Sequence, residues 1–573
     1  MKRLMTWIPC LIAAALVPAG ASRAVEQARV DWISGNAVPI ATVEAGHGFA
    51  DLEPLKAMIG DARVVGLGEG THGTREHFQL KHRLVEYLAT ELGFTLFAIE
   101  ASMPESQDLD PYVRGGEGDP VALIRGMYFW TWRTEEVLAL VEWMRGHNAA
   151  GGDLGFTGFD MQTPDVAAGR VVAFLEDVDP AYAAVARESY AHAIGKKRRG
   201  FGVGTMTFPI HEARGKRIRY SGWIRTEDVS NGCAGLWWRI DGEERGVNLG
   251  FDNMTDRGPR GTTDWTEYVI EMDVPPEAVN INFGVLLSAS GTAWFDDLQV
   301  TLDGDPFDAT SYDFGYEKGG IRHFVSNDEN YSGELDDSVV HSGQRSLRLA
   351  SVAKAATDMV DRGDAVRGAE AVLAHMIAEA PARRAVRPAQ DVDWAVQIAR
   401  VVSQSLALQA EGVAGSHRDR CMADNVLWLL ERDPGARIVL WAHNGHIGRL
   451  DGRMGTYLDE ALGGDYVPVG FTAGGGRYTA IGENSLGAHD LLPPPADSVE
   501  AAFAGTGAPL LMLDLRRAAE DDPGSGWLHG DPFMLSIGAS SSFFQYHRQP
   551  VREAYDLLLW VADTTPAVQL PMR

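Results

Sequence analysis

The sequence is poor in cysteine and in basic residues. Its 573 residues include only three cysteines, too few for a disulfide framework or a four-cysteine zinc site. There are 51 Lys and Arg against 79 Asp and Glu, and the formal net charge of −28 disfavours nucleic acid and anionic membranes as partners. After the first residues, no apolar run is long enough to span a membrane. We therefore expect ordinary hydrophobic cores and no nucleic-acid partner.

The sequence also lacks the familiar motifs of covalent catalysis. It has no G-x-S-x-G elbow, and neither Cys233 nor Cys421 lies in a recognisable nucleophile motif. Water is then the expected nucleophile of any hydrolysis. It needs a base of near-neutral pKa, which histidine supplies, and a carboxylate to hold that histidine.

The first residues have the three-part pattern of a secretory signal. Lys2 and Arg3 precede an apolar run at residues 4–17, which small residues follow at 19–21. The apolar run is shorter than the roughly 20 residues of a spanning helix, which is the alternative interpretation. We predict a signal peptide over residues 1–24, export to the periplasm or the medium, and no membrane attachment after cleavage.

The remaining chain changes its hydrophobic pattern twice. At residues 25–195 and 353–573, short apolar runs alternate with amphipathic stretches, which is typical of a mostly parallel sheet covered by helices. Residues 196–352 instead hold short, alternating, aromatic-rich runs separated by turn residues, as in an antiparallel β-sandwich of the jelly-roll kind. We predict one α/β domain interrupted by a β-sandwich insertion. Three domains in series are the alternative.

Individual elements follow from the same periodicities. Within the α/β parts, we predict strands at 63–68, 95–99, 154–159, 437–441, 466–471 and 509–513, and helices at 74–92, 135–147, 392–411 and 419–431. In the insertion, strands are expected at 218–224, 235–240, 265–272, 280–287 and 292–302.

Ionisable residues follow four of the predicted parallel strands. Glu69 and His72 come after the first strand, Glu100 after the second, Asp160 after the third and His443 after the strand at 437–441. The carboxyl ends of parallel strands open onto one crevice, so these side chains are expected to meet. The sequence therefore predicts a site at this edge of the sheet.

The turn after the first strand also matches a dinucleotide fingerprint. Residues 68–73 read G-E-G-T-H-G, and Glu100 ends the next strand as a ribose-binding carboxylate would. A carboxylate at position 69 would, however, oppose a pyrophosphate. We disfavour the nucleotide interpretation and expect no cofactor.

A second polar cluster contains His443 and His446, three residues apart after a buried strand. This spacing suits two hydrogen-bond donors or two metal ligands. No H-E-x-x-H helix or other diagnostic metal spacing accompanies them. We predict no metal, and a metal-dependent hydrolase or peptidase using the same His and Glu residues stays an alternative.

Together, these motifs resemble the erythromycin esterase family in order and spacing. The similarity covers about residues 50–195 and 355–485 and rests on GEGTHGTRE (68–76), FAIE (97–100), WRTEE (132–136) with WMR (143–145) and Asn148, GFD (158–160), RDR (418–420) and WAHNGH (441–446).

The resemblance implies a metal-independent hydrolase that cleaves a macrolactone ester, an activity that confers macrolide antibiotic resistance. His72 matches the general base that activates water. Glu69 and Glu100 match the active-site carboxylates, and His443 and His446 match a second histidine pair, which we expect to stabilise the oxyanion.

Other matching positions are expected to bind substrate or to support the site: Glu76, Lys81, Trp132, Glu136, Asp160 and Arg418. Lys81 stands where the resistance enzymes carry an arginine. Lysine keeps the positive charge but lacks the planar, two-pronged donor of arginine, so recognition of a carbonyl or carboxylate is expected to differ.

The insertion resembles a carbohydrate-binding jelly roll, through RYSGWIR (219–225), GTTDW (261–265), FGVL (283–286), WFDD (294–297) and HSGQRSLR (341–348). This resemblance implies a glycan partner, with Trp237, Trp238 and Trp294 as candidate stacking residues. Aromatic side chains of a sandwich also fill its core, so a stabilising role is the alternative. A non-catalytic glycan-binding protein is the third functional hypothesis.

Overall fold

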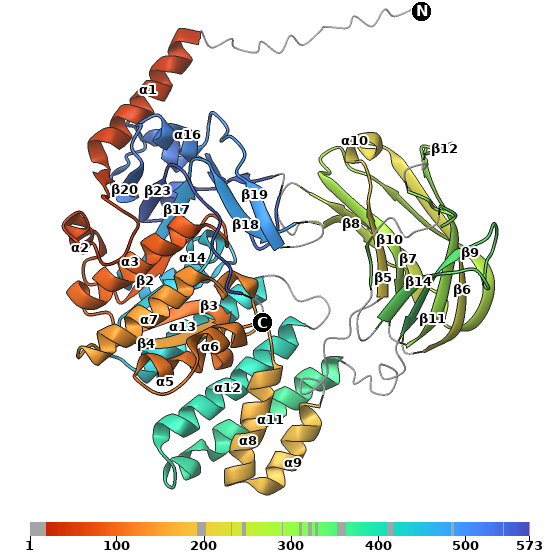
Figure 1. Cartoon of the computed structure of the whole chain (residues 1–573), viewed down its shortest axis with the longest axis horizontal. Coiled ribbons are helices and arrows are strands. Elements are labelled where there is room, and N and C mark those ends of the chain that lie inside the picture. Colours follow the sequence, from red (N-terminus) through yellow and green to blue (C-terminus); the bar gives the residue numbers. More distant parts are fainter. Residues whose placement is uncertain are drawn as a thin grey trace, which may run out of the picture. The chain divides into compact units, whose positions relative to one another are not determined.

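In the computed structural model of the chain, two compact units are present (Figure 1). The first unit comprises residues 1–183 and 369–573, and the second comprises residues 184–368. The structure describes residues 19–191, 202–230, 232–242, 248–288, 290–308, 312–318, 324–326, 331–351, 362–409, 416–482, 486–542 and 544–571. Most of the predicted signal segment lies outside these residues. Across the described ranges, no helix has the length and apolar character needed to cross a membrane.

An eight-stranded sheet forms the centre of the first unit. Its strand order is β1-β20-β23-β17-β2-β16-β3-β4. The strands from β23 to β4 are parallel, whereas β20 runs antiparallel to both β23 and β1. Their bounds are Val38–Pro39 (β1), Val64–Leu67 (β2), Leu96–Ser102 (β3), Gly155–Asp160 (β4), Ile438–Trp441 (β16), Tyr466–Ala473 (β17), Leu510–Asp514 (β20) and Leu557–Val561 (β23).

Helices accompany this sheet in the described part of the first unit, and two of them, at residues 180–189 and 362–384, extend into the second unit. The longer ones are Ala19–Asn36 (α1), Arg75–Leu92 (α3), Glu135–Ala149 (α7), Asp165–Val178 (α8), Pro180–Ser189 (α9), Arg362–Arg384 (α11), Ala389–Leu408 (α12), Ser416–Arg432 (α13) and Met454–Leu462 (α15). Shorter helices are Glu53–Ile59 (α2), Met103–Gln107 (α4), Leu109–Val113 (α5), Pro120–Gly126 (α6), Asn444–Ile447 (α14), Val499–Ala504 (α16) and Val551–Ala554 (α17). Two small hairpins pair Arg477–Ile481 (β18) with Leu486–Asp490 (β19), and Phe533–Leu535 (β21) with Tyr546–Arg548 (β22).

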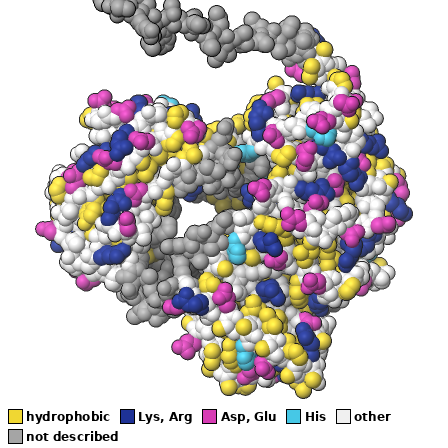
Figure 2. All heavy atoms as spheres, turned by 180° about the vertical axis from the view of Figure 1, so that it is seen from behind, with side chains coloured by type: hydrophobic (Ala, Val, Ile, Leu, Met, Phe, Trp, Pro, Cys, Tyr) yellow, Lys and Arg dark blue, Asp and Glu magenta, His cyan; other side chains and the backbone are white. Residues whose placement is uncertain are grey.

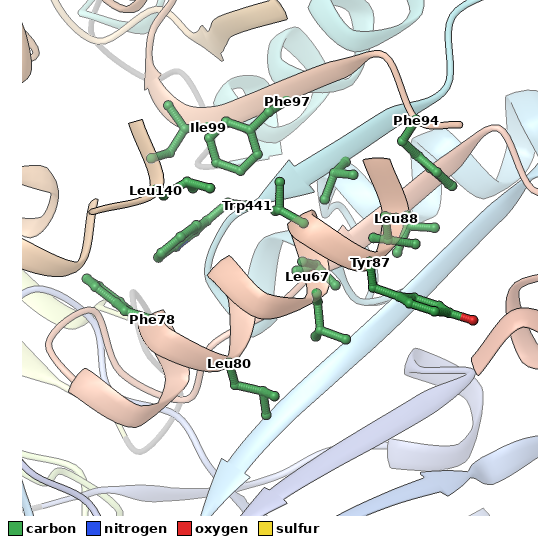
Figure 3. Close-up of a cluster of buried hydrophobic side chains, with 14 of the residues drawn as sticks. Leu67, Phe78, Leu80, Tyr87, Leu88, Phe94, Phe97, Ile99, Leu140 and Trp441 are labelled. Atoms are coloured by element: carbon green, nitrogen blue, oxygen red, sulfur yellow. The ribbon is translucent and has the colours of Figure 1, made fainter. Parts of the chain in front are cut away.

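The central strands of the sheet consist mainly of apolar residues, because helices cover the sheet and exclude water from it. All residues of β2 and β16 are buried, as expected for central parallel strands. Trp441 of β16 lies beside Phe78 of α3, with ring centroids 4.9 Å apart (Figure 3). Helix α3 ends where Gly93 takes a left-handed conformation, with φ of 70°, which glycine adopts without strain. This packing fixes α3, and with it Lys81, against the sheet.

The second unit contains two antiparallel sheets. One has the strand order β13-β5-β10-β7-β8, and the other β14-β15-β11-β6-β9 with β12 beside β11. Their bounds are Gly202–Thr207 (β5), Arg217–Ser230 (β6), Ala234–Asp241 (β7), Asn248–Asp252 (β8), Gly261–Asp273 (β9), Asn280–Leu287 (β10), Ser290–Leu302 (β11), Asp305–Pro306 (β12), Phe324–Val325 (β13), Tyr331–Asp336 (β14) and Ser346–Ser351 (β15); a short helix, α10, spans Ile210–Ala213.

One hydrophobic cluster joins the two antiparallel sheets. It includes Phe283 of β10 and Tyr220 of β6, which meet edge to face at 5.3 Å. Trp238 is fully buried in this cluster, and Trp294 is 5% exposed with its Nε1 donating to Asp336. Both rings are buried, although only Trp238 belongs to this cluster, and of the three candidate stacking residues only Trp237 is partly exposed.

The predicted elements are confirmed wherever the structure describes them, with small shifts of their ends. The parallel part of the large sheet is also as expected. The antiparallel course of β20 was not predicted, because the local sequence of a strand does not encode its direction. On the face drawn in Figure 2, basic side chains lie among acidic ones.

Candidate active site

The candidate site lies at the carboxyl ends of β2, β16, β3 and β4, which are neighbours in the sheet. Glu69 and His72 follow β2, and His443 follows β16. Glu100 lies near the end of β3, and Asp160 is the last residue of β4. Parallel register brings these ends together, so the predicted convergence of the five residues is present in the structure.

Glu69 and His72 form a hydrogen-bonded pair. The Nδ1 of His72 lies 2.7 Å from Oε1 of Glu69, so the carboxylate accepts the Nδ1–H. Glu69 is fully buried, whereas the His72 side chain is 12% exposed. Within the described part of the chain, Nε2 of His72 has no hydrogen-bond partner. This arrangement leaves the Nε2 lone pair available to take a proton.

The other oxygen of Glu69 is held by two donors. Nζ of Lys81 donates at 2.6 Å and Nε1 of Trp441 donates at 2.8 Å, both to Oε2. Burial, the largest influence, would raise the pKa of Glu69, but Lys81 and His72 outweigh it and lower the pKa below its ordinary value. Glu69 is therefore ionised at neutral pH.

A second carboxylate group surrounds Arg418. Its Nη2 donates to Oε1 of Glu100 and to Oδ2 of Asp160, both at 2.7 Å, and its Nε donates to Oδ1 of Asp160 at 3.1 Å. Burial would raise the pKa of Glu100, yet the charges of His446 and Arg418 hold it far below its usual range. The paired carboxylates in turn raise the pKa of Arg418, although burial opposes them.

His446 lies between this group and a further carboxylate. Its Nδ1 is 2.7 Å from Oδ1 of Asp419. Its Nε2 is 3.1 Å from Nη1 of Arg418 and 3.3 Å from Oε1 of Glu100. The ring is thus oriented by Asp419 and presents Nε2 to the charged cluster.

His443 lies between the other two imidazoles. Its ring centroid is 5.1 Å from that of His72 and 6.5 Å from that of His446. Nδ1 accepts the backbone N–H of Gly445 at 3.0 Å, so Nε2 carries the proton and donates to the carbonyl of Ile537 at 3.1 Å. These bonds fix the neutral ring and direct its only N–H to the backbone.

The glycines of the loop at 68–73 serve close packing. A Cβ atom at Gly68 would lie 2.1 Å from Oδ1 of Asn444, and one at Gly73 would lie 1.9 Å from the carbonyl oxygen of Thr479. At Gly70 the nearest atom would be a Leu535 methyl at 3.2 Å. The space beside these glycines is filled by protein, whereas a dinucleotide loop needs it for pyrophosphate. The nucleotide interpretation is therefore disfavoured by geometry as well.

Three of the predicted supporting residues contact backbone. Glu76 accepts the N–H of Thr565 at 2.7 Å, and Glu136 accepts that of Val568 at 3.2 Å. Nε1 of Trp132 donates to the carbonyl of Glu100 at 3.1 Å, and its ring lies 6.2 Å from that of His72. Glu76 thus holds Thr565 at the start of α3, which follows the loop with His72, and Glu136 holds Val568 at the start of α7.

Two residues of the site were not singled out from the sequence. Asp419, which orients His446, lies within the RDR motif that identified Arg418. Asn444 is buried and bonds both the carbonyl and the N–H of Phe471 in β17, at 2.7 and 3.0 Å. It anchors the loop that carries His443 and His446. Their positions in two of the quoted motifs were the only available signal.

The site combines three features. The imidazole of His72 is held by a carboxylate and has an unpaired nitrogen among the described residues. The cation of Lys81 is buried, and the guanidinium of Arg418 lies beside the imidazole of His446. Such a set suits hydrolysis by water, because it supplies a base and positive groups for a developing oxyanion. Within the described ranges, His, Cys, Asp and Glu side chains form no group of three or more with the geometry of a metal site. The fold and the site together define a hydrolase-type α/β protein.

The model of the erythromycin esterase family matches residues 89–207 and 329–564 of this chain. The chain belongs to the erythromycin esterase family, and this membership supports a hydrolase.

Individual relatives have low sequence identity to this chain or match only part of it. An erythromycin esterase type II of Escherichia coli is 31% identical over 133 residues, which span 23% of this chain and 31% of that enzyme. The YbfO protein of Bacillus subtilis (strain 168) is 22% identical over 550 residues, which span 94% of this chain and 91% of YbfO. Among solved structures, an erythromycin esterase mutant in its open conformation has the same fold, with a TM-score of 0.52 at 13% identity over 92% of this chain and 96% of that one.

Proposed function

We propose that this protein is an exported hydrolase that cleaves an ester or macrolactone with water activated by His72. The erythromycin esterase type II of Escherichia coli supports an ester as the substrate class, because it is 31% identical to this chain over 133 residues. The particular ester is open, and a 14-membered macrolide is the first candidate.

In the proposed reaction, Nε2 of His72 removes a proton from water as the oxygen attacks the ester carbonyl. Glu69 accepts the Nδ1–H and stabilises the imidazolium that forms. The guanidinium of Arg418 lies in the same cluster, where its positive charge would stabilise the negative oxygen of the tetrahedral intermediate. His443, expected from the sequence to face that oxygen, has its N–H on the Ile537 carbonyl, so the proposal gives it a positioning role.

The observation that carries this proposal is the difference between the two nitrogens of His72. Nδ1 is fixed by a buried, ionised carboxylate at 2.7 Å, whereas Nε2 has no partner among the residues that the structure describes and belongs to a side chain that solvent reaches. The carboxylate therefore holds the tautomer whose lone pair is on Nε2, which is the form that a general base needs.

The test is hydrolysis of a 14-membered macrolide and of simple alkyl esters by purified protein, followed by mass spectrometry for the gain of water. His72→Ala should lose about 10²–10⁴-fold in kcat while it keeps the thermal midpoint of the parent. His47→Ala is the matched control, because His47 is an exposed histidine on the surface. Full activity of the folded His72→Ala variant would refute the assignment. Loss of activity in chelator would favour the metal-dependent alternative.

We further propose that residues 196–352 are a β-sandwich insertion in the α/β domain. The interruption of the family match between residues 207 and 329 supports an added segment. A glycan ligand for this segment would have to use partly exposed rings. Trp223 and Trp265, on the neighbouring strands β6 and β9, are such rings, and both contact His341, which stacks on Trp223 at 3.9 Å.

A further inference from the structure

The site contains two carboxylate–imidazole pairs, of which the proposed function uses one as a base. The first is Glu69 with His72 and the second is Asp419 with His446, each with Nδ1 at 2.7 Å from a carboxylate oxygen. Asp419 is 1% exposed, and its Oδ1 also accepts the backbone N–H of Met454 at 3.0 Å. The carboxylate is therefore fixed, and it fixes the Nδ1–H tautomer of His446.

The second nitrogen of His446 has a partner in either protonation state. Without a proton, Nε2 can accept from Nη1 of Arg418 at 3.1 Å. With a proton, it can donate to Oε1 of Glu100 at 3.3 Å. A group that gives up and regains a proton needs compatible neighbours for both forms, and this nitrogen has them.

His443 provides the contrast within the same loop. Its Nδ1 accepts a backbone N–H and its Nε2 faces a carbonyl, which can only accept. Only the neutral ring satisfies both bonds. The neighbours of His446 thus suit both protonation states of its ring, whereas these two bonds of His443 suit only the neutral ring.

We propose that His446 is the acid that protonates the leaving oxygen, and that Asp419 is a positioning residue, which holds Nδ1 of His446 so that Nε2 can donate the proton. The inference rests on the proposed ester hydrolysis. His446 enters this step as the imidazolium, with its Nδ1–H donated to Asp419 and a second proton on Nε2. After hydroxide from water has bonded to the carbonyl carbon, the bond to the alkoxide oxygen breaks, and this oxygen takes the proton from Nε2 of His446. The products are the carboxylic acid and the alcohol, and the proton taken up by His72 restores the one lost by His446.

The test compares two esters of one acid, a para-nitrophenyl ester and an ethyl ester. A nitrophenolate leaves without a proton, whereas an ethoxide needs one. Asp419→Asn should lower kcat/KM for the ethyl ester about 100-fold and that for the nitrophenyl ester less than about threefold. His446→Gln should show the same pattern, and it serves if Asp419→Asn does not fold. Asp424→Asn, an exposed carboxylate on the same helix, is the matched control.

Equal losses for both esters, or no loss for either, would overturn the proposal, because a structural or oxyanion role does not depend on the leaving group. Failure of the proposed function is seen separately, as full activity of His72→Ala or as no hydrolysis by the parent. The tautomer is measurable without any substrate, by nitrogen NMR of protein labelled at histidine. A His446 whose Nδ1 carries no proton in the parent would also refute the inference, whatever the activity.

Discussion

Lys81 and Glu69 form a fully buried ion pair, with Nζ 2.6 Å from Oε2. The ammonium also lies over the ring of Trp441, 4.4 Å from its centroid. Burial, the largest influence, lowers the pKa of Lys81 from 10.5 to about 8, although Glu69 opposes this shift. The charge that balances Glu69 is therefore lost at a pH where an arginine would keep it.

This difference predicts an alkaline limit to activity. As pH rises through about 8, Lys81 loses its proton, and Glu69 is left as an uncompensated buried charge beside the base. We expect kcat of the parent to fall above about pH 8 and Lys81→Arg to retain activity to higher pH. The measurement is a pH–rate profile corrected for spontaneous hydrolysis, with the exposed Lys56→Arg as control. A profile for Lys81→Arg that coincides with that of the parent would contradict the prediction.

Glu69→Gln should impair catalysis more than it impairs folding. Glu69 accepts from three donors, and an amide has one oxygen to offer and presents N–H groups to the others. The wrong tautomer of His72 and an unpaired Lys81 are expected, with a loss of about 10²–10⁴-fold in kcat. Activity within tenfold of the parent, in a variant of unchanged circular dichroism, would show that the carboxylate does not hold the base.

Much of this site could be predicted from the sequence because its main residues follow strands. A buried apolar run that ends in Glu69, Glu100 or Asp160 marks the edge of a parallel sheet, and one edge collects all such ends. In the structure, the parallel strand pairs place these residues at one edge of the sheet. The number of strands that carry an ionisable residue, rather than any one motif, was the informative signal.

The remaining parts of the site depend on contacts that the sequence does not record locally. Asp419 lies in a charged stretch of α13, where nothing distinguishes a carboxylate that meets His446 from one that meets water. The carbonyl of Ile537 is a backbone group, and its pairing with His443 spans 94 residues of chain. Such partners are set by tertiary packing, so local periodicity cannot identify them.

Gly73→Ala should disrupt the loop that carries His72. A Cβ atom there would lie 1.9 Å from the carbonyl oxygen of Thr479, and backbone on both sides would have to move. We expect a loss of about 1–3 kcal/mol in the free energy of unfolding and, through displacement of His72, about 100-fold in kcat. Denaturant unfolding and kinetics measure the two effects. Gly126→Ala is the control, since nothing lies within 4 Å of a Cβ atom at that helix position, and an equal effect there would contradict the packing argument.

Glu500 should make stability depend on pH in the direction opposite to that of a paired carboxylate. It is fully buried, Oε1 accepts from Thr472 and from the N–H of Leu535, and among the described residues Oε2 has no partner. Burial raises its pKa from 4.5 to about 6, so the folded state binds the proton more tightly than the unfolded state does. The contribution of this group to the free energy of unfolding is therefore most favourable below pH 4.5 and declines by about 2 kcal/mol as pH rises through 6.

Glu500→Gln is neutral at every pH and should remove that decline. Urea unfolding at several pH values between 4.5 and 7 measures it, with the exposed Glu431→Gln as control. A variant whose pH dependence matches that of the parent would show that Glu500 is not the group responsible.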